Sequence, residues 1–364
     1  MADAQRLRER RLDAKRRRLR RRRSNLVLGA CGILLLSVVA AVALYAFASG
    51  GSGSDADPTK GVAPSVTATS ADAAAQGEGE PGPSRVPDAS QTPQPKPTFR
   101  VERALRDTRR LAAFGVRLGG SPAERRGAVY IAGRLRATGA RIEIRIFRLP
   151  NGKTSRNVVG KFAGDTKQVI ILGAHMDSKP PSPGANDNAS GCAVLLEIAR
   201  CLGRVPAHPT VKVIFFGTEE MIDQNEDHHH YGSRYYVRTM RARERANVAG
   251  MVSVDMVGYG SHFVVRTMGR GPQSMRRLLQ RQAGRRGVRM SYMRDYGQWG
   301  WSDHEAFELA GIPAAWIEWR DDPVYHTASD TPGHIVAGRV RTAGQFLLDV
   351  LYDLDDSGLR RLAR

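Results

Sequence analysis

Three widespread catalytic signatures are missing from this sequence of 364 residues. The zinc-binding H-E-x-x-H pattern does not occur, because His304 and Glu305 are followed by Ala-Phe-Glu and not by a second histidine. The G-x-S-x-G turn that presents a nucleophilic serine is absent, and so is the G-x-x-x-x-G-K-[S/T] loop that binds phosphate. The sequence therefore gives no support to a zincin, to a serine hydrolase with that turn or to a P-loop protein.

Cysteine is also scarce, with three in the whole chain. Cys31 lies in an uncharged run, whereas Cys192 and Cys201 fall in one predicted helix. Nine residues of helix separate two Cα atoms by about 14 Å along the axis, and a disulfide needs Cα atoms within about 7 Å of each other. We therefore expect no disulfide between Cys192 and Cys201 and interpret both as small buried side chains.

Charge is unevenly distributed along the chain. The formal net charge is +20, and residues 1–24 contribute +9 of it, with twelve Arg or Lys against three acids. Residues 26–47 then carry no charge over 22 positions, which is about 33 Å of helix and close to the thickness of a bilayer core. We predict a basic cytoplasmic tail over 1–24 and a transmembrane signal-anchor helix over 25–48, with the rest of the chain extracytoplasmic by the positive-inside rule.

The same region allows two other interpretations. Cleavage of a signal peptide near Ala48 would release a secreted protein, since Ala46 and Ala48 have the small-x-small spacing of a cleavage site. The apolar run is longer than the roughly 7–15 residues typical of signal peptides, which favours the anchor. A basic run can also bind nucleic acid. Because an apolar segment follows it directly, we instead expect contact with anionic lipid and no nucleic-acid partner.

Beyond residue 48 the composition divides the chain into a linker and one folded domain. Residues 49–97 are rich in Gly, Ser, Ala and Pro and hold almost no large apolar side chains. Such a segment cannot bury enough surface to offset the entropy lost on ordering, so we predict a disordered tether. We predict a single catalytic domain over 98–364, which is long enough for a substantial core.

Within that domain, short apolar runs alternate with segments of helical periodicity. Strands are predicted over 141–149, 157–164, 168–176, 211–218, 250–258, 262–267 and 312–319. Helices are predicted over 100–114, 122–138, 189–203, 232–245, 272–284, 302–309 and 334–354. The first strand alternates polar and apolar residues like an edge strand, while the middle strands are apolar enough for burial on both faces. The predicted fold class is α/β, a mostly parallel mixed sheet covered by helices on both faces.

Five segments place His, Asp or Glu at predicted strand ends or just before a helix. They are HMDS (175–178), GANDNASG (184–191), FFGTEE (215–220), SVDMVG (253–258) and YHTASDTP (325–332). The carboxyl ends of parallel strands meet at one edge of a sheet, and imidazole together with carboxylate is a donor set for zinc. The sequence therefore predicts a pair of divalent metals at that edge.

Individual side chains support this prediction. Glu219 and Glu220 follow a very apolar strand, where two adjacent acids repel and are desolvated. A metal hydrolase resolves that conflict when one carboxylate binds metal and the other accepts a proton from the attacking water. Asp255 interrupts an apolar run, where a lone buried carboxylate is costly. His175 is a further candidate ligand, and Asp177 faces the same way along an extended chain and can orient its imidazole.

In this order, the segments resemble the co-catalytic zinc aminopeptidases of the bacterial leucine-aminopeptidase type, which are related to glutaminyl cyclases and to plasma glutamate carboxypeptidase. The resemblance covers about residues 100–355 and includes NVVG (157–160), GSR (232–234) and SDHEAF (302–307). It implies a zinc-peptidase fold of the phosphorylase/hydrolase-like type, a peptide substrate and two Zn²⁺ per chain. The implied ligands are His175, Asp187, Glu220, Asp255 and His326, with Asp187 bridging the two ions.

The resemblance also implies roles for neighbouring residues. Glu219 would be the general base, Asp177 would be the partner of His175, and the peptide bond between Asp187 and Asn188 would be cis. Tyr325 is a candidate substrate contact. Four tryptophans are candidates for the pocket wall, although core packing explains most of them as well: Trp299, Trp301, Trp316 and Trp319.

The loop after Glu220 departs from the compact aminopeptidase pattern. Several of its residues could bind a further metal, although a solvated loop is the simpler interpretation: Asp223, Glu226, Asp227 and His228–His230. This loop and HMDSK are similar to glutaminyl cyclases, which use one zinc and cyclise their substrate, whereas NDNASG and WSDHEAF favour the peptidases. A glutaminyl-peptide cyclotransferase is therefore one alternative. A tethered binding domain without activity is another, and the complete ligand set argues against it.

Overall fold

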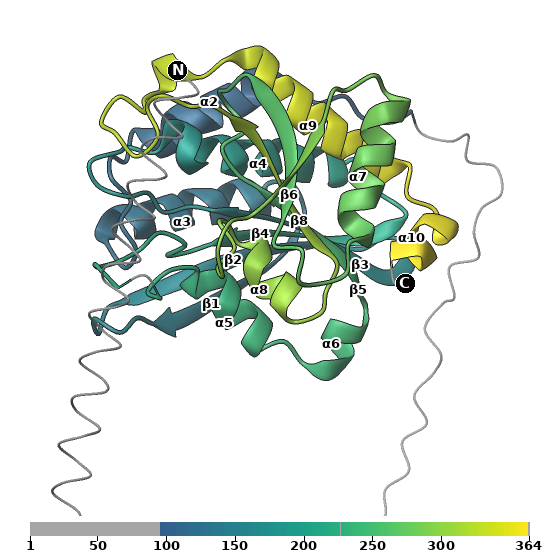
Figure 1. The fold of residues 1–364 in the computed structure, drawn as a ribbon, viewed down its shortest axis with the longest axis horizontal. Helices are drawn as coiled ribbons and strands as arrows, with labels where there is room; N and C mark the ends of the chain where they lie inside the picture. Colours follow the sequence, from purple (N-terminus) through teal and green to yellow (C-terminus); the bar gives the residue numbers. More distant parts are fainter. Residues whose placement is uncertain (1–94, 226, 363–364) are drawn as a thin grey trace, which may run out of the picture. The chain divides into compact units, whose positions relative to one another are not determined.

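The computed structural model describes residues 95–225 and 227–362. Its centre is an eight-stranded sheet with the order β1-β2-β4-β3-β5-β8-β6-β7 (Figure 1). The strands are β1 Arg141–Arg148, β2 Thr154–Phe162, β3 Thr166–His175, β4 Pro209–Phe216, β5 Val248–Val254, β6 His262–Thr267, β7 Ser291–Arg294 and β8 Ala314–Arg320. The α-helices are α2 Val101–Ala112, α3 Pro122–Arg136, α4 Gly191–Leu202, α5 Tyr231–Arg238, α6 Ala242–Ala246, α7 Ser274–Arg285, α8 His304–Leu309, α9 Ala337–Tyr352 and α10 Asp356–Leu362.

The four central strands of the sheet run parallel to one another. Strand β3 pairs in parallel with β4 and β5, and β5 pairs in parallel with β8. The outer contacts β1–β2, β2–β4 and β6–β8 are antiparallel, and β1 is an edge strand as its alternating pattern predicted. The prediction of a mixed α/β sheet is confirmed, and its parallel centre brings the carboxyl ends of β4, β3, β5 and β8 to one edge.

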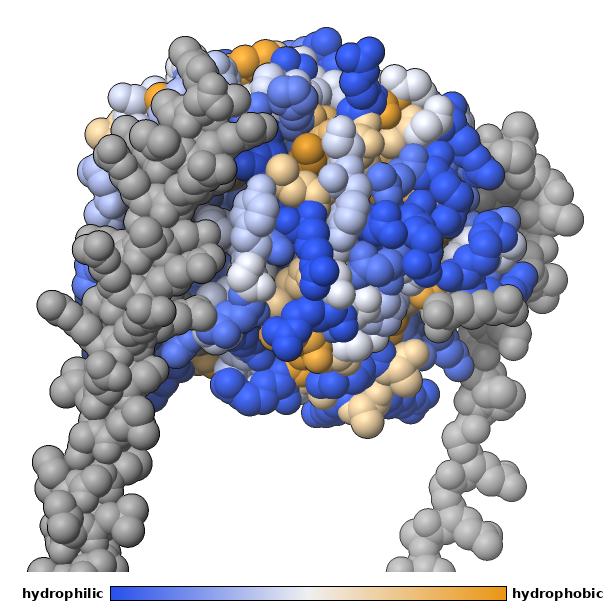
Figure 2. All heavy atoms as spheres, in the orientation of Figure 1, coloured by the Kyte–Doolittle hydropathy of each residue, from blue (hydrophilic) through white to orange (hydrophobic). Residues whose placement is uncertain are grey.

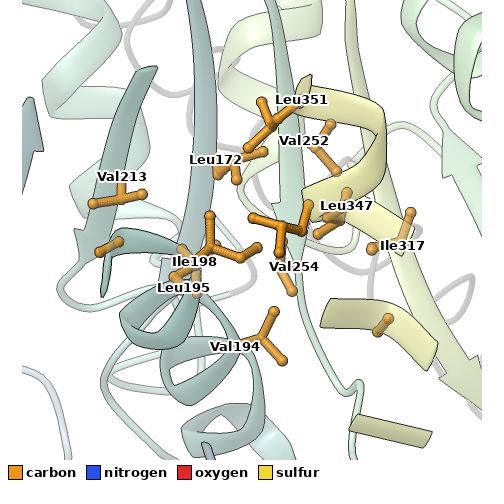
Figure 3. Close-up of a cluster of buried hydrophobic side chains, with 14 of the residues drawn as sticks. Leu172, Val194, Leu195, Ile198, Val213, Val252, Val254, Ile317, Leu347 and Leu351 are labelled. Carbon is orange, nitrogen blue, oxygen red and sulfur yellow. The ribbon is translucent and has the colours of Figure 1, made fainter. Parts of the chain in front are cut away.

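Both faces of the sheet are buried. Along β3, Val169 and Ile171 belong to one hydrophobic cluster, while Ile170 and Leu172 belong to the other. Successive side chains of a strand point to opposite faces, so an unbroken apolar run is what a strand covered on both sides requires. Figure 3 shows part of the larger cluster, where side chains of α4 and α9 meet those of the central strands.

The helices divide between the two faces. Helices α2, α3, α4, α7, α9 and α10 contribute to the larger cluster, and α5 and α8 contribute to the smaller one. In the orientation of Figure 1, α2, α4 and α9 lie in the upper part of the domain and α5 and α8 in the lower part. The outer surface of the same view is dominated by hydrophilic residues, with hydrophobic ones in small groups (Figure 2). Scattered apolar residues of this kind are ordinary on a folded protein.

Some predicted elements need correction. The single helix predicted over 232–245 is two helices, α5 and α6, because Arg241 is extended and the Thr239 hydroxyl donates to the carbonyl oxygen of Tyr235. Strand β7 and helix α10 were not predicted from the sequence. Strand β7 has four residues, none of them buried, so it lacks the apolar pattern that predicts a strand. It forms through backbone pairing with β6.

The predicted basic tail, the predicted anchor and nearly all of the predicted linker lie outside the described residues. Within the part of the chain that the structure describes, no helix is long and apolar enough to cross a membrane. Cys192 and Cys201 are free and buried, as predicted.

Candidate metal centre

The five predicted ligands come from the edge at which the parallel strands end. His175 is the last residue of β3, Asp255 directly follows β5, and Glu220 lies four positions beyond β4. His326 belongs to the loop after β8, and Asp187 lies in the turn Ala185–Ser190 just before α4. Four neighbouring strands and one helix start thus bring together side chains that are far apart in the sequence.

The turn that carries Asp187 is held by buried hydrogen bonds. The peptide bond between Asp187 and Asn188 is cis, as the resemblance implied. The Asn188 side chain donates to the carbonyl oxygen of Val254 at 2.9 Å and accepts from the backbone N–H of Gly191 at 2.9 Å. The Asp330 carboxylate accepts from the backbone N–H groups of Asn186 and Asp187, at 2.7 and 3.2 Å. These contacts tie the turn to β5 and to the His326 loop.

Asp187 lies between two groups of metal-ligating atoms. One group contains His175, Asp187 and Asp255, and the other contains Asp187, Glu220 and His326. Asp187 Oδ1 is 3.1 Å from His175 Nε2, while Asp187 Oδ2 is 3.0 Å from His326 Nε2. Each oxygen of one carboxylate therefore faces a different group, which is the arrangement that a bridging ligand requires.

The remaining donors complete the two groups. Asp255 Oδ1 is 3.4 Å from His175 Nε2, and Glu220 Oε1 is 2.8 Å from His326 Nε2. The other oxygen of Asp255 accepts a hydrogen bond from the Ser302 hydroxyl at 2.8 Å, which fixes the carboxylate. Each group thus offers one imidazole, one carboxylate of its own and one oxygen of Asp187, a donor set that suits Zn²⁺.

Two observations show that a divalent cation fits these residues. Asp255 Oδ1 is buried and has no hydrogen-bond partner, although a buried carboxylate oxygen normally has one. The second observation is the excess of negative charge at the site. Burial lowers the pKa of His175, but the carboxylates of Asp255 and Glu219 raise it well above its ordinary value, because they favour a positive charge between them. Burial likewise opposes charge on His326, yet Glu220 and Asp187 raise its pKa to about 10. The site gathers more negative charge than its two imidazoles compensate.

Glu219 lies beside the two groups and belongs to neither. Its Oε2 is 3.9 Å from His175 Nε2, and its Oε1 is 2.7 Å from His230 Nε2. Burial raises the pKa of Glu219 to about 8, against the lowering effect of the nearby His230 and His175 imidazoles. Because its pKa is raised, this carboxylate holds a proton more tightly than an ordinary glutamate, and its position beside the metal-ligating groups suits a general base.

Asp177 binds the backbone of Glu219 and Glu220. Its two oxygens accept hydrogen bonds from the backbone N–H groups of Glu219 and Glu220, at 3.0 and 3.1 Å. Asp177 Oδ1 is also 3.5 Å from His175 Nδ1, on the side of the ring opposite the metal-ligating atoms. The side chain thus lies where the predicted partner of His175 should lie, and it additionally fixes the backbone that carries Glu219 and Glu220.

The aromatic candidates divide into exposed and buried residues. Tyr325 is 45% exposed, and its ring stacks on that of His326 with centroids 3.7 Å apart, which suits a substrate contact at the mouth of the site. Trp316 and Trp319 are buried and belong to the core. Trp299 is half-buried against His229, while Trp301 is exposed.

The histidine-rich loop forms two separate arrangements. Asp223 and His228 pair with each other near the surface, with Oδ2 and Nδ1 2.6 Å apart. Neither residue belongs to any of the metal-capable groups that the described residues form. His229 and His230 do form such a group with Glu305. Glu305 and Asp330 were not predicted as parts of the site, because no local spacing connects either residue with its partners in the structure.

A family model described as peptidase family M28 matches residues 157–351. Among curated proteins, the chain is 33% identical over 214 residues to aminopeptidase YwaD of Bacillus subtilis, which covers 55% of this chain and 45% of that protein. The chain spans less than half the length of this and the other leading curated relatives.

Solved structures share the fold. A zinc aminopeptidase from Bacillus subtilis, BSAP, aligns with a TM-score of 0.64 at 21% identity, over 71% of this chain and 96% of that one. A glutaminyl cyclase from Bacteroides thetaiotaomicron aligns with a TM-score of 0.64 at 24% identity, over 72% and 100%. Likeness at this level of identity concerns the fold alone. The family model, in contrast, covers more than half of the sequence and all five candidate ligands, so the chain belongs to peptidase family M28.

Proposed function

We propose that the chain is a metallo-aminopeptidase that binds two zinc ions and hydrolyses the first peptide bond of a peptide. The observation that carries this proposal is Asp187, whose two oxygens face two separate groups of donors. A zinc pair held in this way suits a two-metal hydrolase. Relatives named as aminopeptidases support the choice of substrate end.

The ligand roles follow from the two groups. His175 and Asp255 would hold one ion, Glu220 and His326 would hold the other, and Asp187 would contact both. When bound, zinc at this site supplies Lewis acidity that polarises a carbonyl group and acidifies water. Burial of the ligands excludes bulk water, which strengthens these electrostatic effects.

Glu219 performs the proton transfers. Its Oε2 faces His175 and therefore the metal-ligating groups, while its Oε1 is held by His230. Glu219 Oε2 accepts a proton from the attacking water and later returns it to the nitrogen of the leaving amine. The net reaction adds one water across the peptide bond and releases an amino acid and a shortened peptide.

A direct test replaces Glu219 with glutamine in the full-length chain, purified in detergent. We expect Glu219→Gln to retain about two zinc ions per chain and to lose roughly 10²–10⁴-fold in turnover of an aminoacyl reporter. Asp223→Asn, an exposed carboxylate on the following loop, is the matched control and should behave like the wild type. A Glu219→Gln enzyme with wild-type turnover would refute the base assignment.

Glutaminyl-peptide cyclisation is the alternative activity, favoured by the fold of the cyclase structures and by the long loop after Glu220. That reaction consumes no water, because the α-amine attacks the side-chain amide of an N-terminal glutamine and ammonia leaves. We expect the wild type to release free amino acids from peptides and to bind about two zinc ions. Ammonia release from glutaminyl peptides with about one zinc ion per chain would favour the cyclase.

A tethered binding domain without activity is the third possibility. The complete donor set argues against it, since a decayed site would be expected to lose ligands. Chelator-sensitive release of an aminoacyl reporter by the wild type would exclude this possibility. Reporter release that resists chelation would instead point away from the whole metal-dependent proposal.

We further propose that residues 26–47 anchor the enzyme in a membrane and that the catalytic domain is extracytoplasmic. The support is the uncharged run of 22 residues behind a basic tail. Fractionation of expressing cells, with protease added to intact spheroplasts, tests both parts. We expect the full-length chain in the membrane fraction and its catalytic domain digested from outside. A soluble product that begins near Ala48 would indicate cleavage and secretion.

A further inference from the structure

A third cluster of donor atoms lies beside the metal centre. It consists of His229, His230 and Glu305, all buried and close enough to hold a cation. The guanidinium of Arg234 already fills this cluster: its nitrogens are 2.5 and 2.9 Å from Glu305 Oε1 and 3.1 Å from His229 Nε2. The permanently charged guanidinium supplies the positive charge that a metal ion would otherwise bring to these donors. The cluster therefore has a purpose other than metal binding.

The contacts form a chain that ends on Glu219. Arg234 binds Glu305, Glu305 Oε1 is 3.5 Å from His230 Nδ1, and His230 Nε2 is 2.7 Å from Glu219 Oε1. Burial raises the pKa of Glu305, but His230 and Arg234 outweigh that effect and lower it below its ordinary value. Glu305 is thus an anion that can accept from the imidazole. The second oxygen of Glu305 accepts from the backbone N–H of Gly300 at 2.8 Å, which fixes its carboxylate.

The backbone holds His230 in register with Glu219. The N–H of His230 donates to the carbonyl oxygen of Glu219 at 2.8 Å, and the N–H of Tyr231 donates to that of Thr218 at 2.8 Å. His230 has a φ of 53°, a left-handed conformation that a non-glycine residue adopts at a cost. Helix α5 begins directly after it and carries Arg234 one turn later. The loop after Glu220 therefore ends with the imidazole of His230 beside the carboxylate of Glu219.

We propose that His230 is the positioning residue for the base: it binds Oε1 of Glu219 and thereby turns Oε2 toward the metal centre. The geometry supports this division, since Oε1 is 2.7 Å from His230 and Oε2 is 3.9 Å from His175 on the metal side. Glu305, which Arg234 binds, lies 3.5 Å from His230 Nδ1, an ion-pair distance at which this ring nitrogen makes no hydrogen bond. A carboxylate fixed in this way cannot rotate away between accepting a proton and returning it.

This inference rests on the proposed hydrolysis, and its test compares three full-length variants with the wild type. His230→Ala should lower kcat about 100-fold, because misplacing a catalytic group by about 1 Å has effects of that size. KM should change less than about twofold, because His230 would act on the step and not on ground-state binding. His230→Gln, whose amide nitrogen can donate to Oε1, should recover about tenfold of the loss. His228→Ala is the matched control and should resemble the wild type, since His228 pairs with Asp223 instead.

Two readouts separate positioning from a merely structural effect. In a Glu219→Gln background, His230→Ala should lower the residual rate less than about twofold, because a residue that acts through Glu219 has nothing left to position. Zinc content and thermal unfolding of His230→Ala should match the wild type. Equal losses with and without Glu219, or loss of zinc in His230→Ala, would overturn the proposal.

Failure of the inference and failure of the proposed function give different results. A wild-type enzyme that hydrolyses no aminoacyl reporter contradicts the proposed function. An active wild type whose His230→Ala variant is equally active contradicts the inference alone. A His230→Gln variant that is no better than His230→Ala, at equal zinc content and stability, also contradicts it, because the donated hydrogen bond would then have no effect.

Discussion

Two neighbouring clusters in this protein use the same kinds of donor and compensate their charge differently. The candidate ligands of the metal centre are two imidazoles and three carboxylates. Within the part of the chain that the structure describes, no arginine or lysine forms an ion pair with them, and the nearby buried Arg117 donates to backbone carbonyl oxygens instead. The cluster of His229, His230 and Glu305 has two imidazoles and one carboxylate, and Arg234 lies within hydrogen-bond distance of it. Both are buried. Buried donors alone therefore do not define a metal site; these two clusters differ in whether an arginine pairs with the carboxylate.

The reason is the cost of burying charge. An ionised carboxylate removed from water needs a counter-charge or a proton, since the uncompensated ion costs several kcal/mol. Arg234 supplies that charge to Glu305 from within the chain. Asp255 has no arginine partner: its Oδ1 is 3.4 Å from His175 Nε2 and is buried without a hydrogen bond. Zinc is the group that would complete it.

The largest expected effect comes from breaking the metal centre itself. Asp187→Ala removes the carboxylate that faces both groups of donors. We expect zinc content to fall well below that of the wild type and turnover to fall at least about 10⁴-fold, because Lewis-acid stabilisation amounts to several kcal/mol. Metal analysis and reporter kinetics measure the two effects. A variant that retains full zinc occupancy would show that Asp187 is not the shared ligand.

A smaller loss of metal affinity is expected when a residue that only orients the candidate ligands is replaced. Asp177→Asn weakens the contacts to His175 Nδ1 and to the backbone of Glu219 and Glu220. Loss of such a partner typically lowers metal affinity 10–100-fold, and competitive chelation should show a shift of about that size. Asp165→Asn provides the control, because Asp165 also pairs with a histidine, His208, but at the surface. An equal shift in both variants would contradict the role given to Asp177.

Exchanging the internal cation tests the comparison most directly. Arg234→Met removes the guanidinium from the cluster and leaves His229, His230 and Glu305 in place. We expect about tenfold lower turnover, since Glu305 no longer holds His230 firmly. At millimolar zinc we expect binding of one additional ion per chain. Arg238→Met, on the same helix but exposed, should bind no additional zinc. An unchanged metal count in Arg234→Met would mean that arginine is not what excludes a cation.

The sequence predicted the metal centre better than its surroundings. Five candidate ligands that the structure brings together could be named because each follows an apolar strand or precedes a helix, and parallel strands must end at one edge. Glu305 could not be connected with His230 in this way, because it lies on α8 and meets His230 only through tertiary packing. Arg234 is one helical turn from His230, but its partner Glu305 is equally distant in the sequence. The break between α5 and α6 was missed for a similar reason, since 232–245 has no proline and a helical pattern throughout. What the sequence reveals is local periodicity and what it hides is long-range pairing.

Glu124 shows a third way to neutralise a buried carboxylate, and it has the smallest expected effect. Among residues 95–225 and 227–362 no cation pairs with it; it accepts hydrogen bonds from Ser155, Thr218 and the backbone of Gly120. Burial raises its pKa to about 7, and the nearby Asp177 adds to the increase. A bound proton thus neutralises the Glu124 carboxylate, whereas the guanidinium of Arg234 compensates the negative charge of Glu305.

The direction of the resulting pH dependence follows from linkage. The folded-state pKa of about 7 exceeds the ordinary value of 4.5, so the folded state binds more protons than the unfolded state between these two values. The contribution of Glu124 to stability is complete below about pH 4.5 and is lost as the pH rises through 7, by up to about 3 kcal/mol in total. Glu124→Gln should therefore be less stable than the wild type at pH 5, since it loses one hydrogen bond, and this deficit should shrink by pH 8. Denaturant unfolding at both pH values measures the difference, with the exposed Glu102→Gln as the control. A deficit that is the same at pH 5 and pH 8 would mean that Glu124 is ionised in the folded protein and is compensated by something other than a proton.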